Sequence, residues 1–331
     1  MKKIAVAGAG GMGCAISMHL SGLDCEVSLY TPFCDEAKQI NETRENADKL
    51  PGVIIPEQVT VTSDKKKAFT DADILVTATP SRVTRQCMQD IRGYLDRDIL
   101  AVCCSKGIES NTHMLMSGIM SEVLDTARIA VLTGPSHAEE IARKMPTAMV
   151  AASADRETAV AVQNTFMSDY LRIYTSDDML GVQLGGALKN IIALCAGIVD
   201  GMGYGDNTKA ALITRGMSEI ARLGEKMGAR RETFFGLAGI GDLIVTCTSM
   251  YSRNRRAGIR IGQGIPVSEA VAGIKMTVEG YESCVPAYEL SLEYGVPMPI
   301  TEALYNIING RLDVREAVIN LMTRERKDEF L

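Results

Sequence analysis

The sequence predicts an α/β protein with a doubly wound parallel sheet in its N-terminal part and an all-helical C-terminal part. Three observations lead to this prediction. Short apolar runs alternate with helical patterns up to about residue 175, a glycine-rich turn follows the first run, and the pattern is helical from Asp177 onward. Strands that alternate with helices are typical of a parallel sheet that helices cover on both faces.

Seven apolar runs are expected to form the strands. They are Ile4–Ala7, Val27–Tyr30, Val59–Thr62, Ile74–Ala78, Leu100–Cys103, Ile129–Leu132 and Thr147–Val150. Strand-like runs become rare after about residue 175, and Asp177 and Asn207 stand where helix caps are expected. A chain of 331 residues has room for two domains. We expect one domain over residues 1–176 and a helical domain over residues 177–331.

Composition excludes several classes of protein. A net charge of −6 argues against non-specific nucleic-acid binding. No metal site is expected, because the chain has only three histidines and its nine cysteines include no C-x-x-C pair. Cysteines within apolar runs favour a reducing, cytoplasmic compartment. The apolar run Ile191–Val199 is far shorter than the ~20 residues of a membrane span, so no span is expected.

The first strand leads directly into the glycine-rich turn, which reads GAGGMG over residues 8–13 and is followed by a helical pattern. Strand, G-x-G-x-x-G and helix in this order form the dinucleotide-binding fingerprint of a Rossmann-like domain. Gly8, Gly10, Gly11 and Gly13 would permit a tight turn and a close approach of the pyrophosphate to the helix N-terminus. The alternative is an ordinary glycine-rich turn between a strand and a helix.

The choice between NAD and NADP stays unresolved. An acidic residue or an arginine after the second strand usually decides it, but the segment Tyr30-Thr31-Pro32-Phe33 contains neither. Asp35, Glu36 and Lys38 lie further along, where they could belong to the solvated start of a helix.

Lys189 interrupts the apolar helix expected over residues 180–199. Five of the six residues that share its helical face are glycine or alanine, so a ligand or another helix could approach the amine closely. Burial beside a second cation would lower the pKa of this lysine into the range of a general acid or base. A snorkelling lysine with a structural role is an equally plausible interpretation.

Three further segments contain candidate site residues. Lys106 follows the strand at Leu100–Cys103 and would point towards the ligand crevice, since the carboxyl ends of parallel strands face it. His137 follows the strand at Ile129–Leu132, although a lone histidine there is more often a satisfied loop or core residue. Asp242 among glycines suits holding an amine, and the basic run 252–256 suits a phosphate, or is simply a solvated helix start.

Together these blocks resemble the bacterial-type NAD(P)-dependent glycerol-3-phosphate dehydrogenases. The matching blocks cover nearly the whole chain in order: GAGGMG (8–13), LPGVIIPE (50–57), CSKGIE (104–109), GPSHAEEIARKMPTAMV (134–150), LGGALKNIIALCAGIVDGMGYGDNTKAALITRGMSEIARLG (184–224), FGLAGIGDLIVTCTS (235–249) and SRNRRAG (252–258). The resemblance implies reduction of dihydroxyacetone phosphate to sn-glycerol 3-phosphate for glycerophospholipid synthesis, with NAD or NADP as cofactor. A homodimer is left open.

The resemblance also implies a role for individual positions. Lys189 matches the lysine that transfers the proton, and Lys106 and Asp242 complete the catalytic group. The substrate-binding positions are Lys106, Gly134, Ser136, Lys189, Asp242, Ser252, Arg253 and Asn254. The cofactor-binding positions are Gly8, Gly10, Gly11, Met12, Gly13, Lys106, Ala138, Arg253, Thr277 and Glu279.

The chain also departs from the family pattern. His137 stands in place of the usual Phe, Met12 in place of a frequent aromatic residue, Thr277 in place of Val and Gln183 in place of a frequent Glu. Thr31-Pro32 replaces the usual Gly/Arg or Gly/His pair, which puts the customary NADP preference in question. Two alternatives remain: another two-domain hydroxy-acid dehydrogenase, and a catalytically silent nucleotide-sensing relative.

Overall fold

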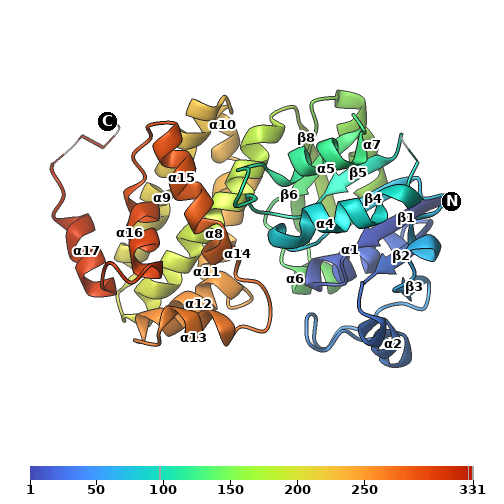
Figure 1. The fold of residues 1–331 in the computed structure, drawn as a ribbon, viewed down its shortest axis with the longest axis horizontal. Helices are drawn as coiled ribbons and strands as arrows, with labels where there is room; N and C mark the ends of the chain where they lie inside the picture. The colour runs from blue at the N-terminus through green and yellow to red at the C-terminus, as the bar shows by residue number, and fades with distance from the viewer. Residues whose placement is uncertain (97, 327, 330–331) are drawn as a thin grey trace.

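A computed structural model describes residues 1–96, 98–326 and 328–329. Its N-terminal part contains an eight-stranded sheet in the order β3-β2-β1-β4-β5-β6-β7-β8 (Figure 1). The strands are β1 (Lys2–Ala7), β2 (Cys25–Tyr30), β3 (Val59–Thr62), β4 (Ile74–Thr77), β5 (Leu100–Cys103), β6 (Ile129–Thr133), β7 (Thr147–Ala152) and β8 (Leu171–Ser176). All seven predicted strands are confirmed to within two residues at each end.

The eighth strand and one strand direction were not predicted. β8 buries alternate residues, including Leu171 and Ile173, at the edge of the sheet, so its apolar run is interrupted by exposed residues. β7 runs antiparallel to β6, whereas the other neighbouring pairs are parallel. The connection between β6 and β7 contains only a five-residue helix, and short connections suit antiparallel pairs.

Helices cover both faces of the sheet, as the fold prediction requires. They are α1 (Gly11–Ser21), α2 (Cys34–Thr43), α3 (Lys65–Phe69), α4 (Ser81–Ile91), the short 3-10 helix Arg92–Tyr94, α5 (Met116–Leu124), α6 (Ala138–Ala142) and α7 (Arg156–Phe166). β1 shows why both faces are apolar: Ile4 and Val6 belong to one core cluster, and Ala5 and Ala7 belong to the cluster on the opposite face.

The C-terminal part is helical and is organised around α8 (Figure 1). Its elements are α8 (Met179–Gly201), α9 (Asp206–Met227), α10 (Arg231–Phe234), a π-helical turn (Leu237–Gly241), α11 (Asp242–Thr248), α12 (Arg253–Gly262), α13 (Val267–Ala272), α14 (Glu279–Glu282), α15 (Cys284–Glu293), α16 (Pro299–Ile308) and α17 (Val314–Met322). α8 is long and apolar enough to cross a membrane, but its whole apolar window is buried inside the protein.

Two predicted helix caps are wrong by one or two residues. Asp178, and not Asp177, caps α8 by accepting a hydrogen bond from the backbone N–H of Gly181 at 2.9 Å. Asp177 instead pairs with Arg230 on the surface. The N-cap of α9 is Gly205, two residues before Asn207. Where several Asp, Gly and Asn residues stand close together, the sequence alone defines the start of a helix only to within one or two residues.

The small residues of α8 allow other parts of the chain to approach closely. A Cβ added to Gly197 would lie 2.1 Å from the carbonyl oxygen of Arg255, and one added to Gly258 of α12 would lie 2.1 Å from that of Leu194. Closer to Lys189, a Cβ on Gly185 would lie 2.7 Å from the carbonyl oxygen of Ala238. Neighbouring helices and turns therefore fill much of the space beside the small residues of α8, where the sequence allows either a ligand or another helix.

Candidate active site

The turn over residues 8–13 has the geometry of an anion-binding cradle. Gly8 has a φ of +109°, and an added Cβ would lie 2.8 Å from the carbonyl oxygen of Ala78, so only glycine fits. A Cβ on Gly13 would lie 1.8 Å from the carbonyl oxygen of Gly8. By contrast, the nearest atom to a Cβ on Gly10 is 4.0 Å away. Gly10 is also the N-cap of α1 and provides no side-chain hydrogen bond, so the helix N–H groups suit an anion on this open side.

Of two other predicted cofactor positions, Ala138 adjoins this turn and Met12 lies within it. Ala138 is the first residue of α6, and its Cβ lies 3.4 Å from the position that a Cβ on Gly11 would take. Met12 is half-buried and packs against the core of the sheet domain. The residues present therefore fit the pyrophosphate of a dinucleotide.

Lys106, Lys189 and Asp242 meet where the two parts of the chain join. Lys106 follows β5, Lys189 lies in the middle of α8, and Asp242 is the first residue of α11. The Nζ atom of Lys189 is 2.5 Å from Oδ1 of Asp242, and the Nζ atom of Lys106 is 2.7 Å from Oδ2. One carboxylate thus bridges two ammonium groups, and the amine of Lys189 is buried and does not snorkel to the surface.

The hydrogen bonds of Lys189 leave one N–H group for a ligand. An ammonium group has three donors. One reaches Asp242, and a second reaches Oγ1 of Thr246 at 2.6 Å. The hydroxyl of Thr246 in turn donates to the backbone carbonyl of Asp242, also at 2.6 Å, which orients its lone pairs towards the lysine. The third donor has no partner among the described residues, so it is available to an oxygen atom placed beside it.

Burial and the neighbouring charges together lower the pKa values of both Lys189 and Asp242. Burial, together with the charge of Lys106, lowers the pKa of Lys189 to about 8, although the negative charge of Asp242 opposes the shift. Burial by itself would raise the pKa of Asp242, but the two ammonium groups outweigh it and hold the pKa below its ordinary value. Lys189 can therefore both give and take a proton near neutral pH, while Asp242 stays ionised.

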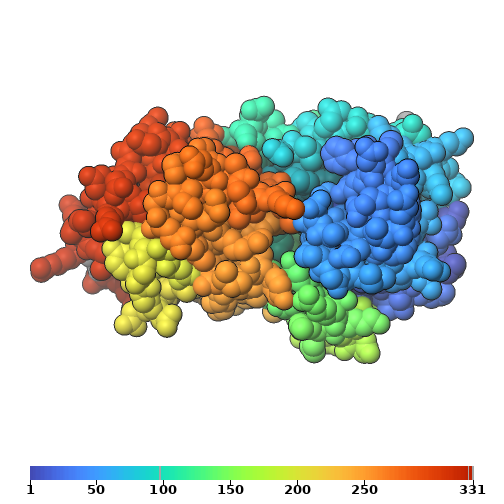
Figure 2. Space-filling view, turned by 90° about the horizontal axis from the view of Figure 1, so that it is seen from below, coloured from blue at the N-terminus to red at the C-terminus, as the bar shows by residue number. Residues whose placement is uncertain are grey.

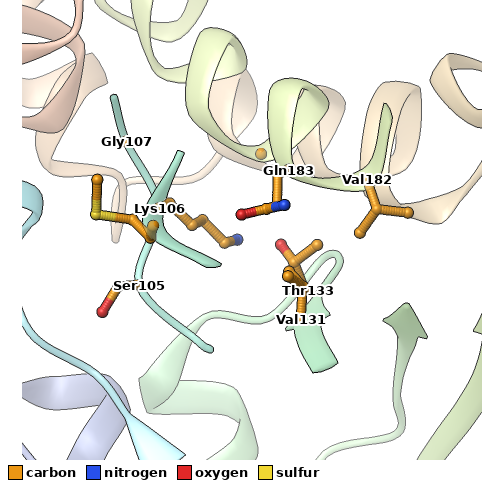
Figure 3. A pocket seen from close by; sticks show the side chains of 9 residues that line it. Ser105, Lys106, Gly107, Val131, Thr133, Val182 and Gln183 are labelled. Carbon is orange, nitrogen blue, oxygen red and sulfur yellow. The ribbon is translucent and has the colours of Figure 1, made fainter. Parts of the chain in front are cut away.

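Lys106 borders a small cavity of about 10 Å³ beneath α8. Figure 3 shows its side chain extending towards the side chains of Thr133 and Gln183. Oγ1 of Thr133 is buried and has no partner, and the volume suits about one water molecule. A Cβ on Gly186 would lie 3.3 Å from this oxygen and 3.7 Å from Cδ of Lys106, so glycine keeps the space open. Gln183 itself is held by the backbone of Ser117 and Met179.

The predicted phosphate-binding residues stand at the N-terminus of α12. Ser252 caps this helix by accepting a hydrogen bond from the N–H of Arg255 at 3.2 Å. Asn254 is buried, and its amide joins Asn190 of α8 to the backbone of Gly280. Arg253 is half-buried, and this burial lowers the pKa of its guanidinium, while Glu279 opposes the shift. Arg255 points elsewhere, because it pairs with Asp200 at 2.7 Å.

Glu279 connects the helical part to the sheet domain. Its carboxylate accepts hydrogen bonds from the hydroxyl of Ser81 at 2.7 Å and from the N–H of the same residue at 3.3 Å. Gly107, with a φ of +142°, leaves room for this contact, since a Cβ there would lie 2.5 Å from Cβ of Ser81. Burial raises the pKa of Glu279 despite these donors. Thr277 is half-buried in the segment before α14.

The segment after β6 contains the remaining candidates. The hydroxyl of Ser136 donates to the carbonyl of Gly134 at 2.8 Å, and both residues are buried. Gly134 has a φ of +150°, and a Cβ there would lie 3.0 Å from the carbonyl oxygen of Ala148. His137 lies 5.9 Å from Tyr251, ring to ring, and its Nε2 is buried without a partner. Burial, with the charge of Lys189, lowers the pKa of His137 to about 4, so the ring is neutral at neutral pH.

Sequence reasoning missed three residues that support the site: Thr246, Ser81 and Asn190. Thr246 lies four residues after Asp242, so a helix after the glycine turn would have placed both on one face. Ser81 and Asn190 gave no such signal, because their partners Glu279 and Asn254 lie 198 and 64 residues away in the chain. The described residues contain no cluster of three or more potential metal ligands.

The structure combines an anion-binding cradle on a doubly wound sheet with a lysine of lowered pKa that a helical part contributes. This combination is typical of a nicotinamide-dependent dehydrogenase. Comparisons with known proteins then identify the family.

The chain belongs to the NAD-dependent glycerol-3-phosphate dehydrogenase family. Residues 3–159 match the family profile of the N-terminus of these enzymes, and residues 178–319 match that of the C-terminus. A glycerol-3-phosphate dehydrogenase (NAD(P)+) from Clostridium perfringens is 46% identical over 329 residues, 99% of both chains. One from Pelotomaculum thermopropionicum is 48% identical over 333 residues, covering 99% of this chain and 95% of the relative.

A solved structure agrees with the fold. The crystal structure of glycerol-3-phosphate dehydrogenase from Coxiella burnetii has a TM-score of 0.93 and 32% identity, and the match covers 98% of this chain and 99% of that one. The predicted resemblance, fold class, dehydrogenase activity and NAD(P) dependence are thereby confirmed. The roles of the individual site residues stay predictions.

Proposed function

We propose that this protein reduces dihydroxyacetone phosphate to sn-glycerol 3-phosphate, reversibly, and that Lys189 transfers the proton. The observation that carries this proposal is the buried amine of Lys189, with two donors occupied, one free and a pKa of about 8. In the reducing direction the free N–H donates its proton to the substrate's carbonyl oxygen as negative charge develops there. In the oxidising direction the neutral amine takes the hydroxyl proton.

Lys106 and Asp242 support this transfer in different ways. Lys106 lies on the other oxygen of the shared carboxylate, so its positive charge can stabilise the developing alkoxide and lowers the pKa of Lys189. Asp242 keeps both amines in place and stays ionised. It acts as a positioning residue and exchanges no proton itself.

The substrate's phosphate fits the N-terminus of α12. This ten-residue helix places its free N–H groups and the guanidinium of Arg253 at one end, which the amide of Asn254 fixes through Asn190 and Gly280. Helix N–H groups and a guanidinium are both suited to a phosphate dianion. Ser252 would hold the helix start, while Gly134 and Ser136 would line the substrate from the sheet side.

The cofactor would lie along the glycine turn, held by the remaining predicted positions. The pyrophosphate suits the N-terminus of α1 at Gly10 and Gly11, beside Met12 and Ala138. Arg253, Thr277 and Glu279 would contact its nicotinamide half from the helical part, together with Lys106. When bound, the reduced nicotinamide supplies a hydride to the carbonyl carbon.

The setting of the reaction follows from its chemistry. Its product is the backbone of glycerophospholipids, so the enzyme would serve their synthesis in the cytoplasm. The nine cysteines are all free, which suits a reducing compartment. We also propose that residues 1–176 form the dinucleotide-binding domain and residues 177–331 the helical substrate domain, with no nucleic-acid partner, no membrane span and a homodimer as the assembly to test first.

The experiment is an assay of NADH and NADPH oxidation with dihydroxyacetone phosphate. We expect Lys189→Ala to lower kcat by about 10²–10⁴-fold, the usual contribution of a general acid. Lys209→Ala is the matched control, because Lys209 is also a partly buried, ion-paired lysine of the helical part, bound to Asp200. Undiminished turnover in Lys189→Ala would refute the assigned role.

Two rival functions give different results in the same experiment. A hydroxy-acid dehydrogenase would turn over a 2-keto acid faster than a ketone phosphate in a substrate panel. A catalytically silent nucleotide sensor would bind the cofactor in a titration but would not oxidise it, whichever ketone phosphate is added. The intact Lys189–Asp242–Lys106 group argues against the sensor.

A further inference from the structure

Glu36 lies next to the glycine turn, and no step of the reaction described above uses it. It belongs to the first turn of α2. Its side chain is 15% exposed and turns back towards the end of β2, where its Oε2 accepts a hydrogen bond from the hydroxyl of Thr31. Its Oε1 pairs with the amine of Lys49. The sequence alone allows Glu36 to belong to the solvated start of a helix.

Two contacts attach this carboxylate to the cofactor cradle. The amide of Asn46 donates to Oε1 of Glu36 at 3.4 Å and to the carbonyl of Ala9, inside the glycine turn, at 2.8 Å. A Cβ on Gly11 would lie 2.9 Å from the carbonyl oxygen of Lys49. The segment 46–49 therefore packs directly on the glycine turn and brings Glu36 to the same edge of the sheet.

The position of the Glu36 carboxylate matters because a bound dinucleotide would place its adenosine ribose nearby. In a doubly wound sheet with a glycine turn after the first strand, the adenosine ribose lies at the carboxyl end of the second strand. That end is Tyr30 and Thr31, and the carbonyl of Tyr30 accepts a hydrogen bond from the N–H of Gly8 at 2.9 Å. A carboxylate at this place accepts a hydrogen bond from a ribose 2′-hydroxyl and repels a 2′-phosphate.

The basic side chains nearby are not arranged for a 2′-phosphate. The guanidinium of Arg44 is engaged by the backbone: it donates to the carbonyls of Ile55 at 3.1 Å and Val59 at 3.0 Å, and also to that of Pro56. The amine of Lys49 is held by Glu36, so it is not free to receive a 2′-phosphate. Figure 2 shows the lobe that contains α2, in blue, beside the orange lobe that contains α12 and α13, and Lys275 reaches across to Asp48 at 2.9 Å.

We propose that Glu36 makes this protein select NAD(H) over NADP(H), by accepting a hydrogen bond from the adenosine 2′-hydroxyl and by repelling a 2′-phosphate. This proposal takes from the proposed function only the reaction that the bound cofactor serves. Cofactor binding can be measured without substrate, so it tests Glu36 whether or not dihydroxyacetone phosphate is reduced.

The experiment is a fluorescence titration of the full chain with NADH and with NADPH, without substrate. We expect the wild type to bind NADH more tightly by about 30-fold or more, and Glu36→Gln to lower this ratio of Kd values by about 10- to 100-fold, the range for losing a charge-assisted contact. Asp35→Asn is the matched control. It removes the same charge from an exposed neighbour in the same helical turn and should change the ratio by less than about twofold.

Two results would overturn the proposal. One is a wild type that binds NADPH as tightly as NADH, and the other is an unchanged ratio in Glu36→Gln. Lys49→Met separates the roles of the paired residues: a selective loss of NADPH binding in this variant would show that the lysine receives a 2′-phosphate, against the proposal. If Glu36→Gln does not fold, competition on the wild type decides, since 5′-AMP should displace NADH more strongly than 2′,5′-ADP does.

Discussion

Replacing Asp242 by Asn tests whether one carboxylate sets the protonation of the site. The substitution keeps an oxygen for the amine of Lys189 but removes the negative charge between it and Lys106. At an effective dielectric constant of about 20, unit charges 2.5 Å and 2.7 Å apart attract by roughly 6 to 7 kcal/mol per pair. Desolvation offsets part of this, and removing one partner of a buried ion pair costs about 3–5 kcal/mol.

This loss predicts a large shift in the pH profile. At about 1.36 kcal/mol per unit, the pKa of Lys189 should fall by roughly 2 to 4 units from its value of about 8. Reduction requires the protonated amine, so the alkaline limb of kcat/KM should move from about pH 8 to about pH 6 or below. At pH 7.5 the protonated fraction, and with it the reduction rate, would fall by about 25-fold or more.

The assay is kcat/KM for dihydroxyacetone phosphate reduction between pH 5 and pH 9.5, with urea unfolding to confirm that Asp242→Asn is folded. Thr246→Val is the control, because it removes the other acceptor of Lys189 without changing charge, and it should shift the limb by less than about one unit. A folded Asp242→Asn protein whose alkaline limb stays near pH 8 would refute the reasoning.

Three other predictions concern stability, measured by urea unfolding. Burial raises the pKa of Glu219 from 4.5 to about 7, so the wild type should lose about 3 kcal/mol of stability as pH rises through this window. The Glu219→Gln variant should lose none of this stability. Equal pH dependence of the unfolding free energy in both proteins would contradict the prediction. Burial lowers the pKa of His137 from 6.5 to about 4, so stability should fall by at most about 3 kcal/mol as pH drops through that window, whereas His137→Phe should be insensitive. Gly258→Ala should cost at least about 2 kcal/mol, because its Cβ would lie 2.1 Å from the carbonyl oxygen of Leu194; wild-type stability would contradict the close packing of α8 and α12.

Much of the fold could be predicted because its signals are local. Seven strands, the glycine turn and the change to helices after residue 176 each depend on residues close together in the chain. β8 escaped prediction because it is an edge strand in which only Leu171 and Ile173 are buried. The direction of β7 escaped as well, because strand pairing depends on the path of the connection and not on the strand's own residues.

The sequence by itself determined which chemical groups this protein has: a glycine turn that admits a dinucleotide, a lysine inside an apolar helix, and too few histidines to take its place. Only the tertiary structure decided how they combine. Asp242 contacts Lys189 and Lys106 across 53 and 136 positions of the chain, and Glu36 turns back to the glycine turn through Asn46. Local patterns determine helices and strands, whereas the pKa of a buried amine depends on charges that only packing brings within a few ångströms.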